Sequence, residues 1–97
     1  MVNHIVLFYM KDKSEVNLQK TKELLLSMRD EIPEIRKISV GIDFLHSERS
    51  CDIALEVVVD DEAALEAYQN HPYHVEVIKK YMHAARLGSV SADYVMD

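Results

Sequence analysis

The 97-residue sequence is short of cysteine, proline and positive charge. Its single cysteine, Cys51, excludes an internal disulfide and any zinc site built on pairs of cysteines. Of its two prolines, Pro33 is expected to end a helix and Pro72 to break the chain between two helical segments. Lysine and arginine number 11 against 17 aspartates and glutamates, which gives a formal net charge of −6. This excess of acidic residues argues against partners such as nucleic acid or an anionic membrane surface.

Long hydrophobic runs are also missing, since no apolar stretch approaches the ~20 residues of a membrane-spanning helix. The first four residues, MVNH, carry no cationic segment ahead of an apolar one, so we expect no signal peptide. Hydrophobic residues make up 48% of the chain and charged residues 29%, a balance typical of globular proteins. These features predict one globular domain over residues 1–97 and a cytoplasmic location.

Four segments have the composition or the two-residue alternation of β-strands, namely residues 2–10, 35–43, 51–59 and 90–96. The first is apolar on both faces, which predicts cover on both sides. The third alternates most clearly, and we expect it to pair with the second as a hairpin. In the last segment the residues expected to share a face are Val90, Ala92, Tyr94 and Met96.

The remaining patterns are helical. One helix is expected from Ser14, whose hydroxyl can cap it, to Glu31, just before Pro33. A second is expected to begin at Asp60 or Asp61 and to break at Asn70-His71-Pro72. A further helical segment over residues 72–85 places one set of side chains on a single side: His74, Val77, Ile78, Tyr81 and Ala85.

The order β-α-β-β-α-β predicts an α+β, ferredoxin-like fold with a four-stranded antiparallel sheet and both helices on one face. The other face of that sheet would still carry apolar residues from three strands. Soluble monomers rarely expose such a patch, so we predict a homodimer in which two sheets pair face to face.

Several motifs resemble the stress-responsive A/B barrel (Dabb) domain family, and the resemblance covers essentially the whole chain. The most specific is a helix ending in Tyr68 followed by His71-Pro72-Tyr73-His74. The others are the opening run His4–Phe8, Ile32-Pro33, Asp52-Ile53-Ala54-Leu55 and the closing Ala92-Asp93-Tyr94.

The resemblance implies a dimeric α+β barrel, in a family whose members mostly have no assigned activity. Some are plant stress proteins, and one plant class is a polyketide cyclase that closes a linear polyketone by aldol condensation without a cofactor. Carried over to this chain, the catalytic residues would be His4, His74 and Tyr68. The first helix carries Leu24, Leu25, Leu26 and Met28 where the plant cyclases place aromatic residues, so the resemblance does not extend to the identity of the substrate.

Imidazoles suit proton transfer at neutral pH, and a tyrosine hydroxyl could hold a developing enolate oxygen. If the protein is an enzyme, His4, His74 and Tyr68 therefore predict cyclase, lyase or isomerase chemistry. The expected helix–sheet pocket would bind a small apolar or aromatic molecule and be lined by Val6, Phe8, Leu25, Met28 and His71. No cofactor is implied.

A non-enzymatic, stress-related structural dimer is the alternative, in which the same side chains pack or cap the helix break. His71 and His74 are spaced to share a helical face, but two imidazoles without a third ligand are weak support for a metal, and we predict none. Cys51 is expected to be an inert, buried thiol. His46 and His83 lie in polar surroundings and are expected to face solvent.

Overall fold

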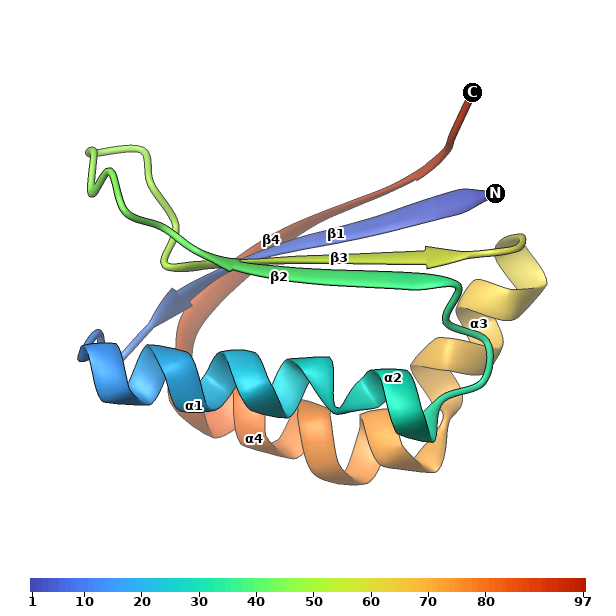
Figure 1. Cartoon of the computed structure of the whole chain (residues 1–97), viewed down its shortest axis with the longest axis horizontal. Helices are drawn as coiled ribbons and strands as arrows, with labels where there is room; N and C mark the ends of the chain where they lie inside the picture. Colours follow the sequence, from blue (N-terminus) through green and yellow to red (C-terminus); the bar gives the residue numbers. More distant parts are fainter.

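The computed structural model describes all 97 residues. Four antiparallel strands form one sheet in the order β2-β3-β1-β4, and the helices lie in a layer on one of its faces (Figure 1). This confirms the predicted fold and the hairpin of the second and third strands. The elements are β1 Val2–Met10, α1 Glu15–Leu26, α2 Met28–Glu31, β2 Lys37–Ile42, β3 Ile53–Val59, α3 Glu62–Asn70, the π-helix η1 Tyr73–Lys79, α4 Lys80–Ala85 and β4 Arg86–Val95.

The central strand β1 sets which residues meet the helices. His4 pairs with Val57 of β3 on one side and with Asp93 of β4 on the other. Because successive side chains alternate between faces, the residues opposite His4 share its face. The helix-facing positions of β1 and β3 are Val2, His4, Val6, Phe8 and Met10 with Ile53, Leu55, Val57 and Val59.

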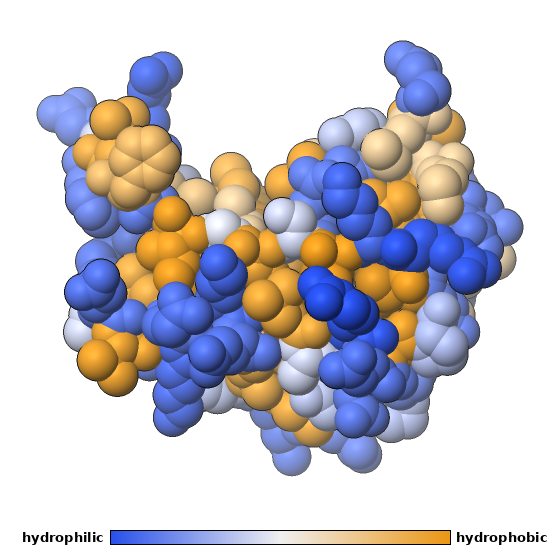
Figure 2. Space-filling view, in the orientation of Figure 1, coloured by the Kyte–Doolittle hydropathy of each residue, from blue (hydrophilic) through white to orange (hydrophobic).

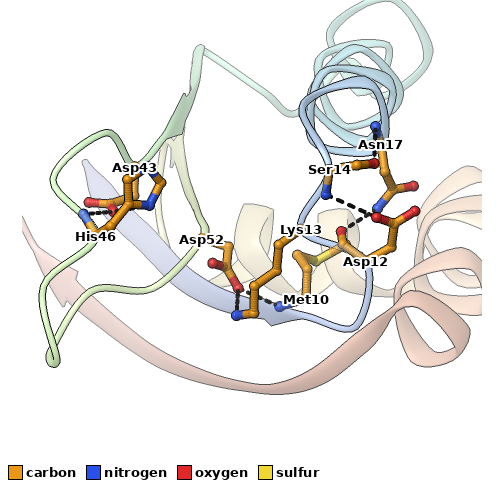
Figure 3. Close-up of polar contacts among 8 residues, drawn as sticks. All are labelled: Met10, Asp12, Lys13, Ser14, Asn17, Asp43, His46 and Asp52. Carbon is orange, nitrogen blue, oxygen red and sulfur yellow. Dashed lines mark hydrogen bonds and ion pairs between the residues drawn. The ribbon is translucent and has the colours of Figure 1, made fainter.

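The first helix begins as predicted, because the Ser14 hydroxyl accepts a hydrogen bond from the Asn17 N–H. Close by, one carboxylate oxygen of Asp52 accepts from the Met10 N–H at 2.7 Å and from Lys13 Nζ at 2.8 Å (Figure 3). These bonds tie the β1–α1 connection to the start of β3. The expected helix to Glu31 is not continuous, however: Ser27 separates α1 from α2, and its hydroxyl donates to the Leu24 carbonyl.

The second helical side differs from the predicted pattern. After the break at Pro72 the chain winds as a π-helix and becomes α-helical only at Lys80. The wider turn moves the inward stripe, because a 3.6-residue period no longer applies. Val77, predicted to face inward, is 39% exposed, whereas Met82 joins Ile78 in the core.

The last strand is longer than predicted. β4 begins directly after α4, so Gly88 and Ser89, which lie between the predicted helical segment and the predicted strand, are strand residues paired with Tyr9 and Phe8. The paired length of β1 explains this, since its backbone groups hold β4 along almost the whole strand. β2 and β3 are each shorter than expected, and Cys51 lies before β3 rather than within it.

The core lies between the sheet and the helices and includes Leu18, Leu25, Met28, Ile53 and Val57. The opposite face of the sheet has no cover within the chain. Its apolar residues include Val90 at 54% and Tyr94 at 47% exposure. On that side the molecule is hollowed and apolar atoms line the hollow (upper edge of Figure 2), between the β2–β3 loop and the chain ends. None of the helices is long and apolar enough to cross a membrane.

Candidate functional site

A cavity of about 210 Å³ opens between the sheet and the helical segments that follow β3. Half of its lining residues are apolar, and most of these are buried; the polar ones lie on β1, η1, α4 and β4. The cavity is smaller than the ~300–1,000 Å³ of typical ligand pockets, so it suits a small molecule. Its lining residues are His4, Val6, Phe8, Leu25, Leu55, Tyr68, His74, Ile78, Lys79, Met82, His83, Arg86, Ser89 and Ser91.

His4 reaches the cavity from β1 and is buried. Its Nδ1 is hydrogen-bonded to a carboxylate oxygen of Asp93, the residue opposite it on β4. A carboxylate accepts, so Nδ1 carries the proton and Nε2 is left for a ligand. Sequence reasoning missed this role of Asp93. The alternation of β4 puts Ser91 and Asp93 on one face, but only the pairing register places Asp93 beside an imidazole.

His74 reaches the cavity from the first turn of η1. Its Nδ1 lies 3.0 Å from the Gln69 carbonyl oxygen, which can only accept, so Nδ1–H donates and Nε2 is again free. Partial burial lowers the pKa of His74, the hydrogen bond to Gln69 opposes this, and the nearby charges of His4 and Lys79 lower it further. The imidazole is therefore held in its neutral form near pH 7.

The ring of Tyr68 in α3 packs against both imidazoles. Its ring centroid is 5.7 Å from that of His4 and 4.8 Å from that of His74. Its hydroxyl donates to Met28 Sδ at 3.7 Å, and the residue is 0% exposed. Burial raises the pKa of the hydroxyl, and the Asp93 charge raises it further. The ring thus contacts both imidazoles, while the hydroxyl has a partner in the core.

Three of the five residues predicted to line the pocket do so, namely Val6, Phe8 and Leu25. Met28 does not line the cavity, because it is fully buried in the core, where it accepts from Tyr68. His71 does not line it either, because it ends α3, and its ring Nδ1 accepts from the Tyr73 N–H at 3.1 Å.

Two cationic residues at the cavity, Lys79 and Arg86, were also missed. Lys79 ends η1 and Arg86 opens β4, so the shifted helix and the longer strand bring both to the cavity. The π-helix and the longer β4, which both differ from the predicted elements, thus each contribute a residue to the site. His83, expected to face solvent, is exposed at the same cavity.

Three other expectations from the sequence concern a metal site, Cys51 and His46. No group of three or more histidine, cysteine, aspartate or glutamate side chains is arranged to hold a metal ion. Cys51 is half-buried, and burial together with the Asp43 charge raises the pKa of its thiol, which disfavours the reactive thiolate. His46 is exposed in the β2–β3 loop, where its backbone N–H donates to Asp43.

The sequence matches the family of the stress responsive A/B barrel domain, Dabb, over residues 2–96. This match spans nearly the full chain. The chain belongs to the Dabb family. No curated protein matches it.

Solved structures agree with this membership. A dimeric protein of unknown function with a ferredoxin-like fold, from Bacteroides fragilis, is 30% identical to the Dabb chain, with a TM-score of 0.82 over 98% of this chain and 95% of that one. A Dabb family protein from Mesorhizobium loti is 19% identical, with a TM-score of 0.79 over 99% and 96%. A hydroxynitrile lyase from Passiflora edulis is 19% identical, with a TM-score of 0.83 over 99% and 93%, a likeness of fold alone. Several such neighbours are dimeric.

Proposed function

We propose that this Dabb protein is a homodimeric enzyme that transfers protons at the carbon next to a carbonyl group of a small apolar or aromatic molecule. Such transfer would allow a carbon–carbon bond to form or break by aldol chemistry, as in a cyclase or lyase. One observation carries the proposal: two imidazoles border the same cavity, and each has its Nδ1 held by a fixed acceptor. Both rings thereby offer Nε2 to a ligand.

The two imidazoles have different surroundings, which suit different roles. His74 is held neutral and serves as the base. His4 donates from Nδ1 to the Asp93 carboxylate, which fixes the orientation of the ring and faces any positive charge that the ring acquires during the reaction. When this ring carries a second proton, its Nε2–H would donate to the oxygen that becomes negative. The Tyr68 hydroxyl, first expected to do this, is directed at Met28, so the proposal gives that role to His4.

The proposed step is balanced without an added reactant. His74 Nε2 removes a proton from the carbon beside a carbonyl, and the C–H electron pair forms an enolate. The enolate carbon attacks a second carbonyl of the same molecule, which forms one carbon–carbon bond. The new alkoxide takes the proton back from the His74 imidazolium. The reverse sequence breaks the bond, which is the reaction class of a lyase.

The dimer is supported by the uncovered apolar face of the sheet and by the dimeric neighbours. At ~25 cal/mol per Å², burying several hundred Å² of this face would favour association by roughly 10 kcal/mol before the costs of association. Val90→Glu, on the exposed face of β4, is expected to give a monomer by light scattering. Val16→Glu, on the outer side of α1, is the control. A dimeric Val90→Glu protein would overturn this part of the proposal.

The chemistry is tested by proton exchange, which needs only the first half of the step. Acetophenone in D₂O is followed by proton NMR for loss of its methyl signal. The wild type should speed exchange, and His74→Gln should reduce the protein-catalysed rate by about 10²–10⁴-fold, the usual contribution of a general base. His71→Gln, the same change three residues earlier and outside the cavity, should keep the rate.

The outcome also separates the proposal from a structural role for the two histidines. If the wild type does not speed exchange of acetophenone or phenylacetone, and His74→Gln only lowers the melting temperature, the protein is a non-enzymatic dimer. If His71→Gln loses as much rate as His74→Gln, the effect comes from the helix break and not from the imidazole.

A further inference from the structure

The charged residues that line the cavity are all of one sign, and the nearby Asp93 carboxylate is hydrogen-bonded to His4. Among its lining residues, Lys79 and Arg86 are cationic and no aspartate or glutamate is present. The chain as a whole has 17 acidic residues against 11 lysines and arginines, so a random selection would favour acids. Neither cation forms a salt bridge, whereas Lys13 and Arg36 are each paired with an aspartate. The cavity lining therefore carries two cations without a salt-bridge partner on an acidic protein.

The two cations also belong to the more exposed part of the cavity lining. The apolar residues and His4 are mostly buried, while Lys79, His83 and Ser89 are exposed and Arg86 is half-exposed. Apart from His4, the buried part of the lining is thus apolar, and the exposed part, where a ligand would enter, is cationic and hydroxyl-bearing. A ligand that fits both parts has an apolar body and an anionic head.

We propose that the cavity binds a small aromatic or apolar carboxylate, with the carboxylate at Lys79 and Arg86 and the apolar part against Phe8, Leu25 and Ile78. This rests on the proposed function and narrows its substrate class to carbonyl compounds that also carry a carboxylate. Arginine presents a planar pair of donors that matches a carboxylate, and lysine adds a compact charge. The Ser89 and Ser91 hydroxyls of β4 lie on the same lining and add neutral donors.

The cavity size supports a carboxylate on one small ring over a long-chain acid. Its volume of about 210 Å³ is below the usual range for drug-sized ligands. Burying a carboxylate without a charged partner is unfavourable, so the head group belongs at the mouth, where both cations remain partly in water.

The test compares benzoate with benzamide, which share a ring and a similar shape but differ in charge. Binding is measured by titration calorimetry at low salt, so no turnover is needed. The wild type should bind benzoate at least tenfold more tightly, because a hydrogen bond to a charged group is about twice as strong as a neutral one. In the double variant Lys79→Gln/Arg86→Gln the two affinities should be within about twofold.

Lys80→Gln is the matched control, since Lys80 follows Lys79 in sequence but does not line the cavity. It should keep the preference for benzoate. Circular dichroism melting checks that every variant folds. A second readout is the titration of the His74 ring by NMR: bound benzoate adds a negative charge nearby and should raise the pKa of His74, and bound benzamide should not.

Each outcome bears on one statement. Equal affinity for benzoate and benzamide in the wild type, or no binding of either, overturns the carboxylate assignment. A preference that survives in the double variant overturns the assignment to Lys79 and Arg86. Tighter binding of phenyl phosphate than of benzoate would replace the carboxylate by a phosphate. In each case the acetophenone exchange of the wild type shows separately whether the proton-transfer function stands.

Discussion

The two helical sides of the molecule cover the same face of one sheet but are built differently. α1 packs over β2 and β3 with aliphatic side chains such as Leu18 and Leu25, and it is a regular, capped α-helix. The other side, α3–η1–α4, is broken by Pro72, contains a π-helix, and carries Tyr68, His74 and Lys79 to the cavity. The regular side fills the core, and the irregular side holds the polar groups.

The strands beneath explain this division. Below α1 the inward residues of β2 and β3 are aliphatic, so regular packing removes them from water. At the edge strand β4 the inward row is Ser89, Ser91 and Asp93, which require polar partners or solvent. Two tyrosines connect the two helical sides through hydrogen bonds between hydroxyl groups. The Tyr73 hydroxyl oxygen lies 2.6 Å from Ser27 Oγ, and the Tyr81 hydroxyl oxygen lies 3.0 Å from Thr21 Oγ1. Stability and chemistry are thus assigned to different halves of the helix layer, which variants can test.

The largest expected effect on stability is for a variant on the regular side, in α1. Leu18→Ala removes a buried side chain from α1 and should lower the free energy of unfolding by about 3 kcal/mol, or roughly 10–20 °C in melting temperature. The rate of proton exchange per folded molecule should not change, because Leu18 does not line the cavity. Val16→Ala, at a site 82% exposed on the same helix, should cost under about 0.5 kcal/mol. An exchange rate that falls with Leu18→Ala would remove the division between the sides.

A smaller effect, on the rate of proton exchange, is expected for Asp93→Asn. The amide keeps the size of the carboxylate but loses its charge, so it weakens the hydrogen bond that orients the His4 ring and should reduce exchange about tenfold or more. The change should also appear in the nitrogen chemical shifts of the His4 ring, which report which nitrogen carries the proton. If those shifts stay as in the wild type while the rate falls, Asp93 acts in some way other than by positioning His4.

Tyr68→Phe should change little. The lost hydroxyl donates only to the Met28 sulfur, a weak acceptor, so the expected loss of stability is under about 1 kcal/mol. Proton exchange should stay within about threefold of the wild type, since the aromatic ring that contacts both imidazoles remains. A loss of a hundredfold or more would show that the hydroxyl turns to the ligand, as first expected from the sequence.

The smallest expected effect is a dependence of stability on pH. The pKa of His74 in the folded protein lies below its ordinary value of 6.5, so below that pH the unfolded chain binds more protons. The contribution of neutral His74 to the free energy of unfolding is therefore complete above about pH 6.5. It is lost as the pH falls from there toward the lower pKa of His74 in the folded protein. Urea unfolding at pH 7.5 and 5.5 should show a smaller decrease for His74→Gln than for the wild type. An equal decrease in both proteins would assign the dependence to other groups.

Much of the fold could be predicted from local sequence. The Ser14 cap, the breaks at Pro33 and Pro72 and the alternation in residues 51–59 each act through neighbouring residues, and the element order followed from them. The fold also brings His4, Tyr68 and His74 to one cavity, as expected from their motifs. The prediction was wrong where a local rule met a longer-range one: Val77 follows a helical period that the π-helix changes, and Gly88 is held in a strand by β1.

By itself, the sequence determined the order and class of the elements, the break between α3 and η1 and the residue types available for chemistry. These depend on backbone preferences and on the two- and 3.6-residue periods, which act within a few residues. The tertiary structure alone decided that Asp93 lies beside His4, that the Tyr68 hydroxyl faces Met28, and that Lys79 and Arg86 border one cavity. Strand register and helix winding set these contacts between residues distant in sequence. The sequence around each residue alone predicts neither the register nor the winding.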